Sequence, residues 1–80
     1  MAKPKTLSGP DVVRILARLG FEVISQRGSH IKLRRDRLGV RETLTVPNHR
    51  ELDRGTVLAI YKQALRYISE AELAPHFFSN

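Results

Sequence analysis

The 80-residue sequence predicts an α+β domain in which a three-stranded antiparallel sheet has one face covered by two helices. Apolar residues recur at helical spacing near both ends of the chain, in residues 9–19 and 56–68. Between these segments the pattern changes to alternating apolar and polar residues, which is typical of half-buried strands. Three short antiparallel strands that bury one face need a cover, and two amphipathic helices provide it. We expect one domain over residues 1–80, because a chain of this length has room for one modest core.

The first helix is predicted over residues 9–19, after a basic lead-in of residues 1–7 that we expect to be flexible. Ser8 can cap the free amides of the first turn, and Asp11 suits the positive end of the helix. Gly20 supplies the left-handed residue that commonly ends a helix. The apolar stripe that would face the core consists of Val12, Ile15, Leu16 and Leu19.

Three strands are predicted next, over residues 21–26, 29–35 and 42–46. Ile24 interrupts the alternation of the first strand. Arg27 and Gly28 indicate a turn, and residues 36–41 indicate a hairpin loop because they include a glycine among polar residues. Pro47 ends the third strand, since a proline cannot donate a hydrogen bond to its neighbour.

A polar connection, residues 48–55, leads to the second long helix over residues 56–68. Ser69 then begins a short final helix of five residues, with a capping box completed by Glu72. Pro75 is expected to stop or kink this helix. The tail, residues 75–80, has no predicted structure.

The composition indicates a small basic protein. Lys and Arg total 14 against 8 Asp and Glu, which gives a formal net charge of +6 and a pI near 10.5. This excess favours an anionic partner: nucleic acid, an acidic protein or a membrane surface. Cysteine is absent, which excludes disulfides, thiolate metal sites and thiolate nucleophiles. Because no apolar run is long enough to span a membrane and no signal peptide is visible, we expect a cytoplasmic protein with no membrane partner.

Positive charge is concentrated around the second and third strands. By alternation, His30, Lys32 and Arg34 project from the same face of the second strand. A basic hairpin is often only a solvated surface or a protected sheet edge, and a histidine on a strand is more often structural than catalytic. Cations around a group that titrates near neutral pH are also what phosphate chemistry requires. Residues 26–41 contain one acid, Asp36, and six basic residues: Arg27, Lys32, Arg34, Arg35, Arg37 and Arg41.

Five short motifs follow one another along the chain: L-x-x-x-G-F (Leu16–Phe21), QRGSH (Gln26–His30), V-P-x-H (Val46–His49), E-L-x-x-G-T (Glu51–Thr56) and KQA (Lys62–Ala64). With these motifs in this order, the sequence resembles the HicA family, the small toxins of HicA–HicB toxin–antitoxin systems. The resemblance extends over about residues 8–73 and implies a double-stranded-RNA-binding-like αβββα fold. It also implies a ribonuclease that cleaves mRNA and is neutralised by a HicB-type antitoxin.

The resemblance implies a metal-independent endoribonuclease without a cofactor, whose catalytic histidine is His30. A ribose 2′-hydroxyl that attacks the adjacent phosphate needs a base, and the departing 5′-oxygen needs an acid; histidine suits either role because its ordinary pKa is about 6.5. No carboxylate cluster, cysteine pair or H-x-x-H motif is present to hold a metal. Lys32 or Arg34 would stabilise charge in the transition state. The other candidates are Gly28, Ser29 and His49 as catalytic support, and Arg27, Lys32, Arg34, Arg35, Arg37 and Arg41 as RNA-binding residues.

Two other interpretations stay open from the sequence. A non-catalytic RNA-binding module would use the same basic face, and it would tolerate replacement of His30. An interaction protein would dock an acidic partner on the basic hairpin without contacting RNA. His49 follows the third strand and comes close to His30 if the strands pair, but it is equally plausible as a loop hydrogen-bonding residue. His76, near the end of the chain, has no expected role.

Overall fold

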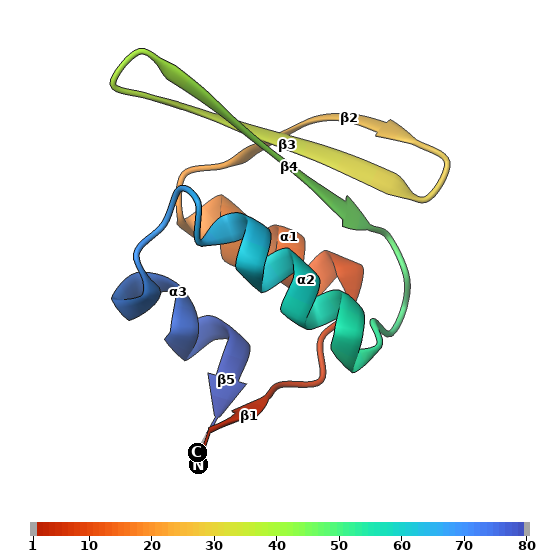
Figure 1. Ribbon diagram of the computed structural model, residues 1–80. Helices are drawn as coiled ribbons and strands as arrows, with labels where there is room; N and C mark the ends of the chain where they lie inside the picture. Colours follow the sequence, from red (N-terminus) through yellow and green to blue (C-terminus); the bar gives the residue numbers. More distant parts are fainter. Residues whose placement is uncertain (1, 80) are drawn as a thin grey trace.

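The computed structural model describes residues 2–79 and confirms the predicted α+β fold: a three-stranded sheet lies on a layer of helices (Figure 1). Met1, the first residue of the predicted lead-in, and Asn80, the last residue of the predicted tail, lie outside the described residues. The elements are β1 (Lys3–Pro4), α1 (Gly9–Arg18), β2 (Glu22–Arg27), β3 (His30–Arg37), β4 (Val40–Pro47), α2 (Arg54–Ala64), α3 (Glu70–Phe77) and β5 (Phe78–Ser79).

β3 is the central strand of the sheet and runs antiparallel to both of its neighbours. Its register places Lys32 between Ser25 of β2 and Thr45 of β4. The pairing of β2 shifts by one residue between Val23 and Ser25, which is a β-bulge. The bulge explains why Ile24 interrupts the alternation, and it turns Ser25 to the face that carries Lys32.

Both hairpins close with two-residue turns that require positive φ angles. Gly28 has φ +59° at the first central position of the β2–β3 turn, as a type II′ turn demands. In the β3–β4 turn Leu38 has φ +52° and Gly39 has φ +78°, the pattern of a type I′ turn. The loop predicted over residues 36–41 is therefore a tight turn, and β3 and β4 extend further than the sequence indicated.

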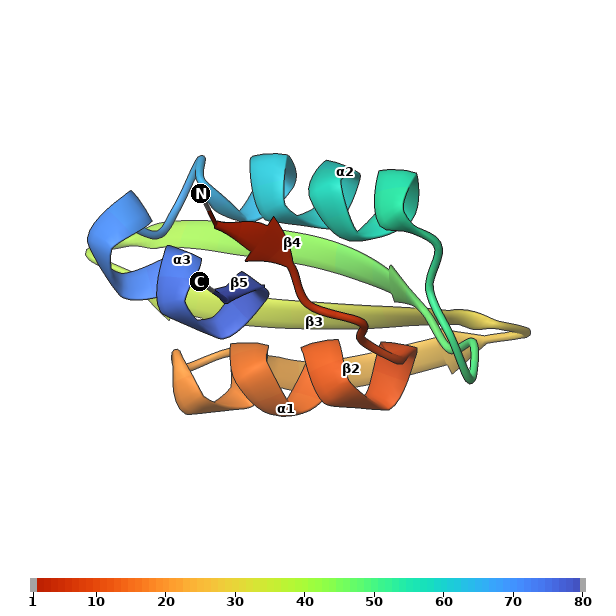
Figure 2. The same ribbon diagram turned by 90° about the horizontal axis from the view of Figure 1, so that it is seen from below.

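The core lies between the helices and one face of the sheet, which we call the inner face. Figure 2 shows α1 and α2 running side by side against this face, with α3 packed across one end. α1 begins at the predicted capping box, in which Ser8 and Asp11 each bind the backbone amide of the other. The buried apolar side chains are Ile31, Leu33, Leu44 and Val46 from the sheet and Val12, Leu16, Val57, Ile60, Tyr61, Ala64, Leu73 and Phe77 from the helices.

The chain ends differ most from expectation. α3 continues through Pro75 to Phe77, because a proline removes a single amide donor while the fully buried Leu73 and Phe77 hold the turns on either side. The lead-in and the tail, for which no structure was predicted, each contain a short strand, and β1 and β5 pair as a two-stranded sheet. Leu7, at the end of the lead-in, is buried in the core. Within residues 2–79, no helix has the length and apolar character needed to cross a bilayer.

Candidate functional site

His30 is the first residue of β3 and lies on the outer face of the sheet, which we define as the face opposite the helices. It pairs directly with Arg27 of β2 and with Pro47 of β4, so the imidazole and the Arg27 guanidinium arise from adjacent positions. The β2–β3 turn, whose glycine is Gly28, brings these two residues together. The side chains of Arg27, Ser29 and His30, which belong to the QRGSH motif, are exposed.

A shallow hollow surrounds His30 on the outer face. The next outward residue of β3, Lys32, lies between two hydroxyl-bearing residues of the neighbouring strands. The hollow therefore combines one imidazole, two cations and several neutral hydrogen-bonding groups. Its lining residues are Ser25, Gln26, Arg27, His30, Lys32 and Thr45.

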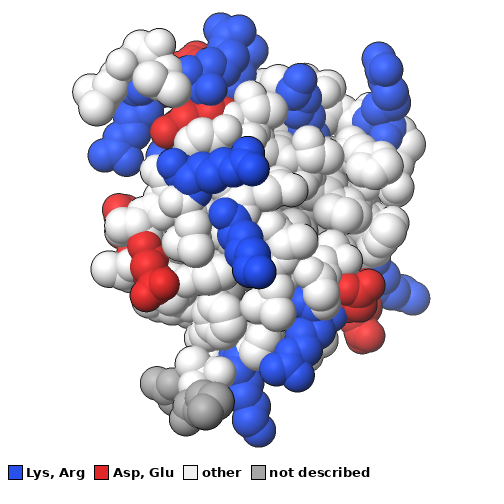
Figure 3. Space-filling view, viewed as in Figure 1, with Lys and Arg blue, Asp and Glu red and all other residues white. Residues whose placement is uncertain are grey.

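Three cations of the outer face, Arg27, Lys32 and Arg34, form no ion pair with an acid of the described residues. Among the described residues, the ion pairs are Arg14–Asp11, Arg35–Glu42 and Arg41–Asp36. Arg27, Lys32 and Arg34 are absent from these pairs, so their charges are available to an anion. Figure 3 shows Lys and Arg side chains at the top of the molecule, where the sheet lies, and also near the chain ends. The hollow differs from the rest of a generally basic surface because it combines two unpaired cations with the imidazole of His30.

One backbone hydrogen bond connects the turn before His30 to the loop after β4, and a second connects that loop to the beginning of α1. The amide of Asn48 donates to the Ser29 carbonyl oxygen at 2.5 Å, and the amide of Gly9 donates to the His49 carbonyl oxygen at 2.8 Å. Gly9 leaves no room for a side chain: a Cβ there would lie 2.9 Å from Asn48 Cα and 3.0 Å from His49 N. We call Gly9, Ser29, Asn48 and His49 the loop latch. It sets the position of the turn relative to the helices.

His49 enters the latch through its backbone, and its side chain is not among those that line the hollow. The imidazole instead lies near Asp53, the N-cap of α2. Hydrogen bonds from Thr56 lower the pKa of the Asp53 carboxyl, and the nearby His49 charge lowers it further. The structure thus brings Ser29 and Gly28 beside His30, while the His49 side chain is not part of the hollow.

Arg35 occupies the inner face, away from the hollow. Its Nε donates to Glu42 Oε1 at 2.5 Å, and both side chains are largely buried, 13% and 10% exposed. Its two terminal nitrogens donate to the carbonyl oxygens of Leu19 at 2.7 Å and Tyr67 at 3.0 Å. The guanidinium also lies 4.8 Å from the centre of the Phe21 ring, as a cation–π contact. Each of the three guanidinium nitrogens of Arg35 therefore donates a hydrogen bond, and two of these bonds tie the sheet to the segments that follow α1 and α2.

Arg37 ends β3 and Arg41 lies near the start of β4, so both are beside the β3–β4 turn that projects at the edge of the molecule (Figure 1). Arg37 pairs with the exposed Val40, and the Nε of Arg41 is 3.3 Å from Asp36 Oδ1. Of the six predicted RNA-binding residues, three share the outer face with His30 without an acidic neighbour in contact: Arg27, Lys32 and Arg34.

Sequence reasoning missed three residues that line the hollow: Ser25, Gln26 and Thr45. Thr45 alternates with the buried Leu44 and Val46 and so points outward, but only the register shows that it flanks Lys32. Ser25 could not be assigned to a face because the bulge reverses the alternation of β2. The Gln26 side chain curls around the turn and donates to the Gly28 carbonyl oxygen at 3.2 Å.

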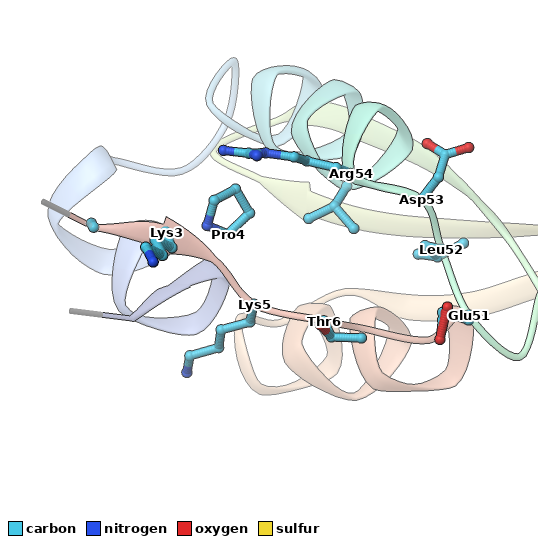
Figure 4. Close-up of a pocket in the computed structure, with 10 residues that line it drawn as sticks. Lys3, Pro4, Lys5, Thr6, Glu51, Leu52, Asp53 and Arg54 are labelled. Carbon is cyan, nitrogen blue, oxygen red and sulfur yellow. The ribbon is translucent and has the colours of Figure 1, made fainter.

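A second hollow lies between the N-terminal segment and the beginning of α2 (Figure 4). Its basic side chains are Lys3, Lys5 and Arg54, and these share the hollow with two acids, Glu51 and Asp53. The mixed charge makes it a poorer site for a polyanion than the outer face. Within residues 2–79, no three His, Cys, Asp or Glu side chains gather closely enough to hold a metal ion.

Residues 9–65 match the family described as the HicA toxin of bacterial toxin–antitoxin. The chain belongs to the HicA toxin family. The HicA match begins at the latch glycine and ends just after α2, so it includes the whole three-stranded sheet and the hollow around His30. Neither the curated proteins nor the solved structures gave a match to this chain.

Proposed function

We propose that this HicA protein is a metal-independent endoribonuclease that cleaves mRNA in the bacterial cytoplasm, with His30 as its catalytic residue. One observation carries the proposal: an exposed imidazole stands beside two cations without acidic partners, Arg27 and Lys32, in one hollow. A phosphodiester placed there would meet positive charge on both sides of a proton-transfer group.

In the proposed reaction the ribose 2′-oxygen attacks the adjacent phosphorus, and the bond from phosphorus to the 5′-oxygen breaks. The 2′-hydroxyl loses a proton and the leaving 5′-oxygen gains one, so the products are a 2′,3′-cyclic phosphate and a 5′-hydroxyl. His30 performs one of these two transfers. Lys32, two residues along the same strand and therefore about 7 Å away, stabilises the additional negative charge of the transition state.

A HicB-type antitoxin would neutralise this activity by covering the hollow. Arg27 and Lys32 are exposed and Arg34 is partly exposed, and the natural complement of these three cations on a protein partner is a group of carboxylates. An inhibitor with that chemistry would compete directly with the phosphates of RNA. Its binding would therefore weaken as the salt concentration rises.

The test compares purified wild type, His30→Gln and His76→Gln on end-labelled RNA in the presence of EDTA. His76 lies in α3, far along the chain from the hollow, so His76→Gln controls for loss of a histidine. We expect wild type and His76→Gln to produce 5′-hydroxyl and cyclic phosphate ends, and His30→Gln to leave the RNA intact. Equal cleavage by all three proteins would disprove catalysis by His30.

Induced expression provides the matching test in cells. We expect wild type to stop growth and degrade mRNA, and His30→Gln to do neither. If purified wild type binds RNA with a steep salt dependence but never cleaves it, the protein is an RNA-binding module.

A further inference from the structure

The cations of the outer face form a single file along β3. His30, Lys32 and Arg34 occupy alternate positions of the strand, and residues two apart on a strand are about 6.7 Å apart. Consecutive phosphates of an extended polynucleotide strand are separated by a similar distance. The file can therefore meet one phosphate at each of its three positions.

The file is one residue wide, and it ends at Arg34. Lys32 is flanked by the neutral Ser25 and Thr45, so positive charge does not spread across the sheet at that position. The face is three strands wide, or about 10 Å between the outer strands, which suits one nucleic-acid strand better than a duplex.

Acidic side chains lie at the end of the file that is farthest from His30. Glu22 lies opposite Arg34 in the register of β2 and β3, although the two side chains form none of the ion pairs of the described residues. At the next outward position Asp36 is held in an ion pair by Arg41. Beyond Arg34, therefore, the outer face offers a phosphate no net positive charge.

We propose that the outer face binds one unpaired strand of RNA along β3, with three consecutive phosphates at His30 and Arg27, at Lys32 and at Arg34. This inference rests on the proposed ribonuclease function and defines its substrate class. An unpaired strand can also bring its 2′-oxygen into line with the leaving 5′-oxygen, whereas a regular duplex holds the 2′-oxygen out of line.

The outer face contacts the RNA backbone rather than the bases. Base recognition in single strands usually depends on aromatic side chains that stack on the bases. All the aromatic residues of this chain lie with the helices or at the chain ends, and none lies on the outer face. They are Phe21, Tyr61, Tyr67, Phe77 and Phe78. Binding is therefore dominated by phosphate contacts and shows little base preference.

The test measures the binding of fluorescent RNA in which every 2′-hydroxyl is methylated, so that cleavage cannot occur. For single strands, the logarithm of the binding constant falls with the logarithm of salt by about 0.7 for each phosphate contact. We expect Lys32→Gln and Arg34→Gln each to reduce this slope by about 0.7. Lys62→Gln and Arg18→Gln remove the same charges from exposed helix positions and should leave the slope unchanged.

Two further comparisons use the same assay. Single strands of different base composition should bind within a few-fold of one another, and a perfect duplex of equal length should bind at least ten-fold more weakly. Equal or tighter duplex binding would overturn the proposal, and so would a slope that responds to Arg18→Gln and Lys62→Gln instead of the β3 variants.

These outcomes are separable from those of the proposed function. If His30-dependent cleavage occurs but the β3 variants do not change the salt slope, the nuclease assignment stands and the RNA path along β3 is wrong. If the slopes change as expected but wild type never cleaves, the path stands and the catalytic assignment fails.

Discussion

Arg34 and Arg35 are neighbours on β3, but their side chains lie on opposite faces of the sheet and make different contacts. Arg35 binds Glu42, two backbone carbonyl oxygens and an aromatic ring. Arg34 is partly exposed and takes part in none of the ion pairs within residues 2–79. The number of arginines in a strand therefore overstates the positive charge that a ligand can contact. The two faces should respond differently to mutation: the outer face through activity and the inner face through stability.

The largest expected effect is the loss of catalysis in His30→Gln. A positioned acid or base contributes about 10²- to 10⁴-fold to the rate, so single-turnover cleavage should fall by that factor. Because His30 is exposed and outside the core, the free energy of unfolding should change by less than about 0.5 kcal/mol. Urea unfolding of the same samples checks this, and a large loss of stability would show that the two faces are not independent.

Arg35→Gln should have the largest effect on stability. Breaking a buried ion pair and leaving its partner uncompensated costs about 3–5 kcal/mol, and Glu42 would be that partner. Arg34→Gln is the matched control, with the same substitution one residue away, and it should cost little. The double variant Arg35→Met, Glu42→Leu should recover part of the loss because no unpaired charge remains. Equal urea midpoints for Arg34→Gln and Arg35→Gln would contradict the comparison.

Gly9→Ala should affect both stability and the site, because the new Cβ meets the backbone of the loop latch rather than a flexible side chain. Overpacking of this kind costs about 1–3 kcal/mol. The amide NMR signals of Ser29 and His30 should shift, and cleavage should slow. Gly55→Ala is the control: its Cβ would lie 3.5 Å from Asp53 Oδ1, an ordinary contact, and it should leave these signals in place. Unshifted Ser29 and His30 signals in Gly9→Ala would show that the latch does not position the turn.

The smallest expected effect is a gain of stability at the projecting end of β3. Leu38 is 94% exposed and has φ +52°, so its side chain buries almost nothing while its backbone is strained. Leu38→Asn creates the Asn-Gly pair that type I′ turns prefer and should stabilise the fold by about 0.5–1 kcal/mol. The melting temperature should rise by several degrees with cleavage unchanged. Slower cleavage would show that this end of β3 also takes part in function.

Local pattern was sufficient for the fold and for the outward direction of His30 and Lys32 on β3. The alternation of β3 correctly separated Ile31 and Leu33 from His30 and Lys32, because a strand sends successive side chains to opposite faces. The capping box at Ser8 was also correct, since its two hydrogen bonds join residues three positions apart. The QRGSH motif located the turn before β3.

The remaining features of the site depend on residues far apart in the chain. The outward position of Ser25 results from the bulge, which only the pairing of β2 with β3 defines. Arg35 loses its place on the predicted RNA surface because its partners include Leu19 and Tyr67, 16 and 32 residues away. The His49 backbone is held by Gly9 from another element.

By itself, then, the sequence determined the order of the elements, the positions of the main turns and the residues that face away from the core. These follow from helical and strand periodicity and from the φ angles that glycine allows. The tertiary structure alone decided which cations remain free, which neighbours flank Lys32 and how the chain ends are held. Those outcomes depend on strand register and on long-range hydrogen bonds, whose partners no local pattern specifies.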